Sequence, residues 1–197
     1  MTAQFQLQFA ERDLYSLGEQ YRRETGEREQ RLENAAFEAG AAIRNGDFSL
    51  INLEPIVRWK SERAAHYLIG NSSESIRRAL EVAASPEAST REALSALLGL
   101  HGVDLPVASA ILTAIFPERY TVMDWRVLEA LGYPRQDVHF YLDFLAYCKD
   151  LAAGDGTLPA QSSVTGSTPL RSLDRALRQW SENQDEPAHK ASAAVAA

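Results

Sequence analysis

Aliphatic side chains recur at helical spacing along most of this chain, and the alternation typical of strands is confined to residues 5–9. Glycine, proline and capping residues interrupt the helical pattern, which therefore divides into separate segments. We expect an all-α fold. The pattern predicts one or two helices in residues 11–45, with Gly26 as a break, and then helices at 55–69, 74–84, 90–98, 105–116, 122–131, 137–152 and 170–180.

Local signals give the expected ends of several of these helices. Pro55 is expected to begin the helix at 55–69. A proline has no backbone N–H, and the first turn of a helix leaves its N–H groups without intrahelical partners, so the proline costs nothing there. Ser72 or Ser73 is a candidate cap for the next helix, and Ser89 or Thr90 for the one after it. Glu92 follows Ser89 at the spacing of a capping box.

The chain has 197 residues, of which 45% are hydrophobic, and we expect a single domain over residues 1–182. Residues 154–168 are rich in Gly, Ser, Thr and Pro, which predicts a surface loop. Residues 183–197 are polar and then alanine-rich, and we expect them to be a disordered tail.

Charge and cysteine content exclude some classes of protein. The formal net charge of -7 argues against a protein that coats nucleic acid through bulk positive charge. The single cysteine, Cys148, excludes a disulfide framework, and the four histidines are too scattered to form a metal site. The chain has no long apolar run and no leader-like start, so we expect a cytoplasmic protein without a membrane partner.

The most informative segment is 97–112, which predicts two apolar helices joined by a short turn that contains Gly102. Glycine can adopt the positive φ that such a turn requires. The amides that follow Gly102, at the start of the second helix, are then placed to bind one backbone phosphate. The alternative is an ordinary helical hairpin with no ligand.

This segment and the one after it resemble the helix-hairpin-helix DNA glycosylase superfamily. The resemblance rests on Leu100-x-Gly102-Val103-x-x-x-x-Ala108, on Pro117, and on the run Tyr120-Thr121-Val122-Met123-Asp124-Trp125-Arg126-Val127. Asp124 follows Gly102 by 22 residues, which is the separation expected in that superfamily. The unit comprises a hairpin at 93–116 and an Asp-bearing helix start at 121–131.

The resemblance implies a helix-hairpin-helix glycosylase-like fold and a protein that flips a nucleotide out of duplex DNA. The Asp124 carboxylate would then stabilise the positive charge that develops as the N-glycosidic bond breaks, or deprotonate the attacking water. Gly102, Val103, Asp104 and Arg126 are the candidate DNA contacts. Asp124 is also a candidate N-cap for the helix that follows it, and the two roles are compatible.

Two positions depart from the superfamily pattern. Asp104 occupies the place of a second hairpin glycine; it would cap the second helix but repel a phosphate. Pro106 occupies the place of the lysine that forms a Schiff base in the members that also cleave the DNA backbone. We therefore expect a monofunctional enzyme. Lys60 is a possible substitute for that lysine, although a lone lysine is more often solvated or ion-paired.

The remaining candidate residues concern the base and a cation. Trp59, Lys60, Arg63, His66 and Tyr67 are expected on one helix, where an aromatic and cationic stripe would hold a flipped base. The alternative is a core tryptophan covered by arginine stems. Trp125 lies beside Asp124 and would help to exclude water. The resemblance also implies a monovalent cation on the main-chain carbonyls of Leu98, Leu100 and Val103.

The sequence thus predicts a monofunctional DNA N-glycosylase that removes a modified or mispaired base, with duplex DNA as its partner. The alternative is a catalytically inactive nucleic-acid-binding or protein-interaction module of the same fold. Neither the identity of the base nor the oligomeric state follows from the sequence.

Overall fold

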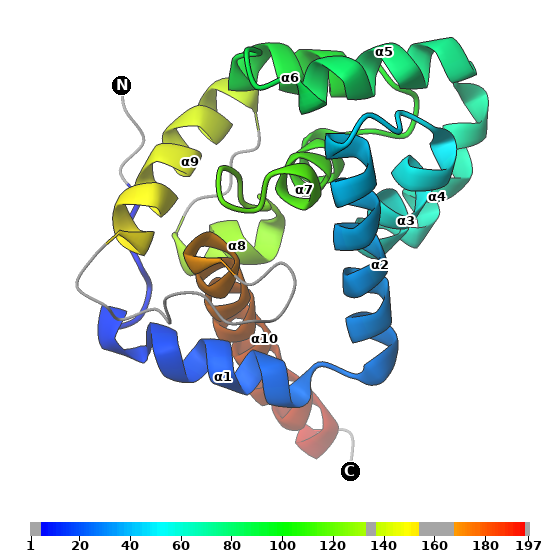
Figure 1. Cartoon of the computed structure of the whole chain (residues 1–197). Coiled ribbons are helices and arrows are strands. Elements are labelled where there is room, and N and C mark those ends of the chain that lie inside the picture. The colour runs from blue at the N-terminus through cyan, green and yellow to red at the C-terminus, as the bar shows by residue number, and fades with distance from the viewer. Residues whose placement is uncertain (1–4, 133–136, 154–167, 196–197) are drawn as a thin grey trace.

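The computed structural model describes residues 5–132, 137–153 and 168–195, and within them the regular secondary structure is helical, without a strand (Figure 1). The 154–168 loop predicted from the sequence therefore lies outside the described residues, except for Thr168. The helices are η1 (Glu11–Asp13), α1 (Leu14–Glu24), α2 (Glu27–Arg44), α3 (Leu50–Lys60), α4 (Glu62–Tyr67), η2 (Leu68–Gly70), α5 (Ser73–Ala84), α6 (Thr90–Leu98), α7 (Leu105–Ile115), α8 (Trp125–Ala130), α9 (Val138–Ala152) and α10 (Pro169–Val195).

Most helix starts lie where the sequence places a capping residue. Ser72 caps α5 by accepting a hydrogen bond from the Ser75 amide, and Ser89 forms a complete capping box with Glu92 at the start of α6. Gly26 separates α1 from α2, as predicted. These local signals were correct because a cap satisfies amides within three residues of itself and needs no tertiary partner.

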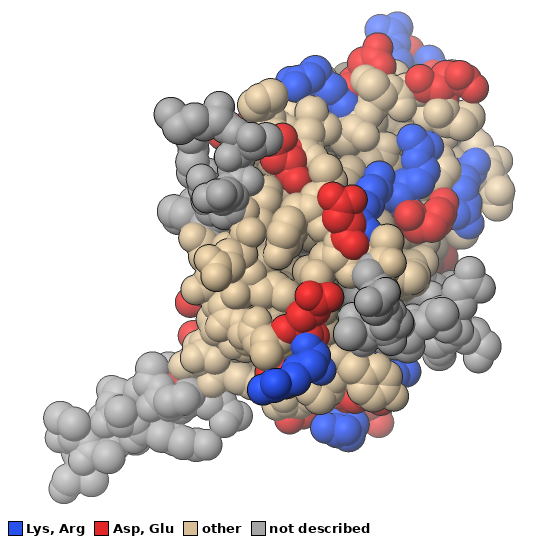
Figure 2. All heavy atoms as spheres, turned by 90° about the vertical axis from the view of Figure 1, so that its left-hand side faces the viewer, with Lys and Arg blue, Asp and Glu red and all other residues tan. Residues whose placement is uncertain are grey.

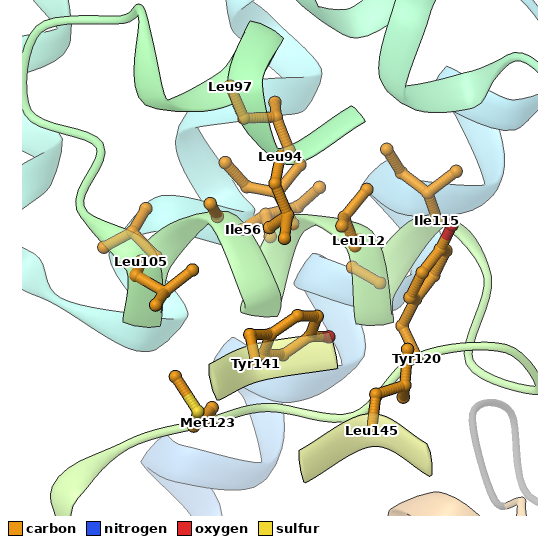
Figure 3. Close-up of a cluster of buried hydrophobic side chains, with 14 of the residues drawn as sticks. Ile56, Leu94, Leu97, Leu105, Leu112, Ile115, Tyr120, Met123, Tyr141 and Leu145 are labelled. Carbon is orange, nitrogen blue, oxygen red and sulfur yellow. The ribbon is translucent and has the colours of Figure 1, made fainter. Parts of the chain in front are cut away.

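Helix α7 forms the centre of the core, and nearly all of its residues are buried. Figure 3 shows Leu94 and Leu97 of α6 on one side of α7, and Met123 and Tyr141 on the other. The Tyr141 hydroxyl donates a 3.0 Å hydrogen bond to the Thr121 carbonyl, so its one polar group is satisfied inside the core. The segment that leads to Asp124 is thereby fixed against α7 and α9.

Helix α2 crosses α7 at very short range. A Cβ built on Gly40 would lie 2.1 Å from the Ala114 carbonyl oxygen, so only glycine allows the two backbones to approach this closely. The same helix packs along α3, whose Leu53, Ile56 and Val57 are fully buried. Helix α3, which carries Trp59 and Lys60, is therefore held rigidly against the core.

The second half of the molecule is built on α10. Helices α1 and α8 both pack against it, and Figure 1 shows α10 passing behind α1. The extended segment before η1 adds further contacts: the Gln8 amide donates to the Ala130 carbonyl at 2.9 Å, and Phe9 stacks on Trp180. None of the described helices has both the length and the apolar character needed to cross a membrane.

Four predicted boundaries were wrong. The helix predicted at 122–131 begins only at Trp125, because Asp124 is extended and caps it. Pro55 does not open a helix; it lies inside α3, which begins at Leu50 after the Ser49 cap. The helix predicted at 55–69 is divided, because Ser61 is extended and caps α4 through the Ala64 amide. The last helix does not end at Trp180; α10 continues past the predicted domain boundary at residue 182, and the Asn183 side chain hydrogen-bonds to Gln20. The rest of the predicted tail is helical as far as Val195.

Candidate functional site

The turn between α6 and α7 has the geometry that the sequence predicted. Gly102 has a φ of +87°, and a Cβ at this position would lie 2.7 Å from the Tyr67 Cβ. The Val103 amide donates to the Leu100 carbonyl at 3.2 Å, and this bond closes the turn. Asp104 caps α7 by accepting a 3.0 Å hydrogen bond from the Val107 amide, as expected from its position.

Helix α4 and Asn71, the residue directly after η2, support this hairpin from one side. The Asn71 side chain accepts from the His101 amide at 2.7 Å and donates to the His101 carbonyl at 2.9 Å. The Tyr67 ring packs edge-on against the His101 ring, with centroids 5.5 Å apart. Asn71 thus fixes the main chain directly before Gly102, a role that only the three-dimensional structure reveals because the two residues are 30 positions apart.

A shallow cavity of about 300 Å³ lies between α4 and the hairpin. Arg63 and Tyr67 line it from α4, and Gly102, Val103 and Asp104 line it from the hairpin. Arg63, His66 and Tyr67 are exposed, and of these three predicted base-pocket residues Arg63 and Tyr67 face the hairpin across the cavity. Trp59 and Lys60 are on the preceding helix, α3, so the expected single stripe on one helix does not exist.

Asp124 is nearly buried and makes two direct contacts. Its carboxylate caps α8 by accepting a 3.1 Å hydrogen bond from the Val127 amide, so the N-cap role predicted for it is confirmed. The same carboxylate forms an ion pair with Lys60 of α3, in which the side chains are 14% (Lys60) and 10% (Asp124) exposed. Of the two roles expected for Lys60, a substitute lysine and an ion-paired residue, the structure shows the ion pair.

The contacts of Asp124 determine its charge. Burial alone would raise the pKa of the Asp124 carboxyl, but the charge and hydrogen bond of Lys60, with the Val127 amide, lower the pKa below its ordinary value. Arg178 of α10 adds a smaller favourable charge. The carboxylate is therefore ionised at neutral pH although it lies almost out of contact with water.

Trp59 has a different environment from the one predicted for a base pocket. Its ring packs against Phe37 of α2, and the Arg171 guanidinium lies over it at 5.2 Å from the ring centroid. This is the alternative arrangement given above, a core tryptophan covered by an arginine, with the arginine supplied by α10.

Helix α10 carries three arginines on one face, Arg171, Arg175 and Arg178, which we call the arginine row. Arg171 pairs with Asp174, and Arg178 pairs with Glu182. Arg171 and Arg175 both bind Glu33 of α2, a partner that the sequence analysis missed. The available signal was the helical spacing of Glu33 to the buried Ala36, Phe37 and Gly40, which places a carboxylate on an apolar face.

Trp125 and Arg126 follow the Asp124 cap in the first turn of α8. Trp125 is 55% exposed, and the Arg126 guanidinium lies 4.2 Å from the centroid of its ring. Arg126 also contacts Asp185 at 2.9 Å. The predicted DNA contact of Arg126 remains a prediction, and its charge is partly neutralised in the free protein.

Three further arginines, Arg77, Arg78 and Arg119, are engaged in contacts within the protein. Arg77 and Arg78 both pair with Glu74, and Arg119 lies over the rings of Phe116 and Tyr120. On the face that Figure 2 presents, Lys and Arg side chains alternate with Asp and Glu instead of gathering into one basic surface. This distribution favours a few local contacts over broad electrostatic attraction to DNA.

The main-chain carbonyls predicted to hold a monovalent cation, those of Leu98, Leu100 and Val103, belong to the hairpin at 93–116. The Leu100 carbonyl accepts a hydrogen bond from the Val103 amide and keeps one lone pair for a further contact. The cation stays a prediction. Among the described residues, His, Cys, Asp and Glu side chains do not cluster in groups of three or more that would bind a metal.

Three comparisons with known proteins gave no assignment. The chain matches no known family, no curated protein and no solved structure at a significant level.

Proposed function

We propose that this protein is a monofunctional DNA N-glycosylase that removes a modified or mispaired base from duplex DNA. The observation that carries the proposal is the ionised, nearly buried Asp124 carboxylate at the start of α8, 22 residues after the positive-φ hairpin glycine Gly102. A fixed negative charge in a site of low dielectric stabilises a cationic transition state far better than the same charge in water.

The proposed reaction assigns separate tasks to separate residues. The amides after Gly102, at the N-terminus of α7, bind one backbone phosphate and position the duplex. Water attacks the sugar C1′ atom, and the electron pair of the N-glycosidic bond leaves with the base, which takes a proton from solvent. Asp124 stabilises the oxocarbenium-like transition state and accepts the proton of the attacking water. Lys60 keeps Asp124 ionised before the substrate binds.

Release without strand cleavage is the expected outcome, for a structural reason. Pro106, in the first turn of α7, has no amine. Lys60 contacts Asp124, but it does so as a paired ammonium, which is not nucleophilic. Borohydride treatment of the protein with an abasic duplex should therefore trap no covalent complex, and a Lys60-dependent adduct would contradict the monofunctional assignment.

Asp124→Asn tests the catalytic proposal directly. Asparagine is also a good N-cap, so the variant keeps the start of α8 while losing the charge. We expect base release from modified duplexes to fall by about a hundredfold or more, with DNA affinity and the circular dichroism spectrum little changed. Asp137→Asn, at the N-cap of α9, is the matched control and should release bases at the wild-type rate. Unchanged release by Asp124→Asn would refute the role of the carboxylate.

The hairpin needs its own test. Gly102→Val places a β-branched residue at a φ of +87° and should weaken duplex binding across a salt titration. Gly46→Val is the matched control, because Gly46 also has a positive φ, of 100°, but lies in the turn before α3 with open space around its Cα. Equal affinity of the two variants would show that the hairpin binds no phosphate.

The second candidate is a nucleic-acid-binding or protein-interaction module without catalysis. The observation in its favour is that the Asp124 carboxylate is already ion-paired with Lys60, and that little of either side chain is exposed (14% of Lys60 and 10% of Asp124). A wild-type protein that binds duplex DNA in a Gly102-dependent manner, but releases none of a broad panel of modified bases, would establish this candidate instead.

A further inference from the structure

A cavity of about 240 Å³ lies between α1, the first turns of α2, and α10. Tyr21 and Arg22 line it from α1, Glu33 and Asn34 from α2, and Arg175 from α10. These residues come from three elements far apart in the sequence. None of them was a candidate in the sequence analysis.

The lining of this cavity leaves several hydrogen-bond donors free to contact a ligand. Within the described part of the chain, neither the Tyr21 hydroxyl nor the Asn34 side-chain amide has a hydrogen-bond partner, although both residues line the cavity. The Glu33 carboxylate, in contrast, already accepts from the Arg171 and Arg175 guanidinium groups. A ligand would therefore contact the Tyr21 hydroxyl, the Asn34 amide and the Arg175 guanidinium rather than a free carboxylate.

Arg175 is the least well compensated member of the arginine row. Its Nε is the one buried side-chain nitrogen or oxygen in the described residues that lacks a hydrogen-bond partner. Burial lowers the Arg175 pKa, and repulsion from Arg171 lowers it further, since the two cations share Glu33. An additional acceptor at the cavity would stabilise this charge.

The arginine row connects the cavity to Asp124. Arg175 and Arg178 are three residues apart on α10 and so lie on the same face, about one helical turn apart. Arg178 lies within electrostatic range of both Tyr21 in the cavity and the Asp124 carboxylate. The cavity and the proposed catalytic group thus border the same stretch of α10.

We infer that this cavity receives the base that is extruded from DNA, and that the base is neutral and carries exocyclic carbonyl oxygens. The inference rests on the proposed function. Carbonyl oxygens accept from the Tyr21 hydroxyl, the Asn34 amide and the Arg175 guanidinium, whereas a cationic N-alkylated base is repelled by Arg22 and Arg175. A volume of about 240 Å³ is below that of a site for drug-sized ligands and suits one ring system.

The binding test does not depend on catalysis. The probes are free hypoxanthine, free adenine and an N-methylated cationic adenosine, titrated into the wild-type chain while the arginine Nε–H signals are followed by nuclear magnetic resonance. We expect a saturable shift of the Arg175 signal with hypoxanthine alone. Tyr21→Phe and Asn34→Ala should each weaken that binding about fivefold, the usual effect of one neutral hydrogen bond. Tyr15→Phe is the matched control, because Tyr15 is 53% exposed on the same helix.

Base release then separates this inference from the proposed function. We expect Asp124-dependent release of hypoxanthine or uracil from duplex DNA, reduced in Tyr21→Phe, and much slower release of N-methylated adenine. Asp124-dependent release that is equal for all these bases and unaffected by Tyr21→Phe would overturn the inference and leave the glycosylase proposal standing. Absence of hypoxanthine binding would also overturn it. Absence of release from every duplex, with hypoxanthine binding retained, would refute the glycosylase proposal and leave the cavity standing as a base-binding site.

Discussion

Lys60→Met isolates the contribution of the Lys60–Asp124 ion pair. Methionine has nearly the length of lysine without its charge, so the variant leaves the Asp124 carboxylate buried with only the Val127 amide and the more distant Arg178. Removing one partner of a buried pair costs about 3–5 kcal/mol, because the remaining charge is uncompensated. The pair here is 14% and 10% exposed and the cap remains, so we expect about 3 kcal/mol at pH 7.

The loss should depend on pH, with a sign fixed by Asp124. In the wild-type chain the folded-state pKa of Asp124 is below its ordinary value, so its ionised form adds stability above that value, and this is lost as the pH falls through the folded-state pKa. In Lys60→Met only burial, the Val127 amide and Arg178 remain. Burial then dominates, the pKa of Asp124 rises, and the protonated form is buried at little cost. The difference between the two proteins should be large at pH 7 and shrink toward pH 4.

Urea denaturation followed by circular dichroism at pH 7 and near pH 4 measures both quantities. Arg77→Met is the matched control: it removes an exposed ion pair with Glu74 and should cost less than about 1 kcal/mol at pH 7. A Lys60→Met protein that is as stable as Arg77→Met at pH 7, or that loses the same free energy of unfolding at both pH values, would refute the argument.

Three further variants test the fold around the site. Gly40→Ala should destabilise the chain by about 3 kcal/mol or more in urea denaturation, since its Cβ would meet backbone atoms of α7 that cannot rotate away. Asp104→Ala removes the cap of α7 and should cost about 1 kcal/mol in the same assay, while raising duplex affinity at low salt because it also removes a negative charge beside the proposed phosphate site. Glu33 has a folded-state pKa of about 2 against an ordinary value of 4.5, so it contributes stability above pH 4.5 that is lost toward pH 2; Glu33→Gln should flatten the acid limb of the stability profile, and an unchanged limb would contradict that pKa.

The sequence predicted those parts of the fold that depend on neighbouring residues. The caps at Ser72, Ser89, Asp104 and Asp124 each satisfy an amide three residues away, and all four are in place. The positive φ at Gly102 is equally local, because it follows from a short turn between two apolar helices.

Pro55 was misplaced because tertiary packing outweighed a local rule. A proline at the sixth position of α3 forfeits one backbone hydrogen bond and strains the preceding turn. Leu53, Ile56 and Val57 around it are fully buried, and burial of three such side chains is worth about 1.5–3 kcal/mol each, which exceeds the cost of one proline. No local signal reports that burial, so the start of α3 at Leu50 could not be predicted.

The site itself depends on contacts that span most of the chain. Lys60 meets Asp124 across 64 residues, and Arg171 meets Glu33 across 138. Asp124 was identified from its spacing to Gly102, but its ionic partner was not, because sequence spacing says nothing about which lysine a fold brings to a given carboxylate. The spacing of the arginine row places its members on one face of α10, whereas the spacing of Glu33 indicates a carboxylate on an apolar face of α2 but not which arginines it meets.

The double variant Lys60→Met/Asp124→Asn separates stability from catalysis. A buried ion pair is often no more stabilising than a neutral pair of similar volume, because desolvation offsets the attraction between the charges. Asparagine keeps the cap of α8, and methionine keeps the packing of Lys60, so the double variant should recover most of the stability lost in Lys60→Met and unfold within about 1 kcal/mol of the wild-type chain. If Asp124 is the catalytic carboxylate, this stable protein should still release no base. Recovery of stability together with base release would mean that the ion pair serves the fold alone.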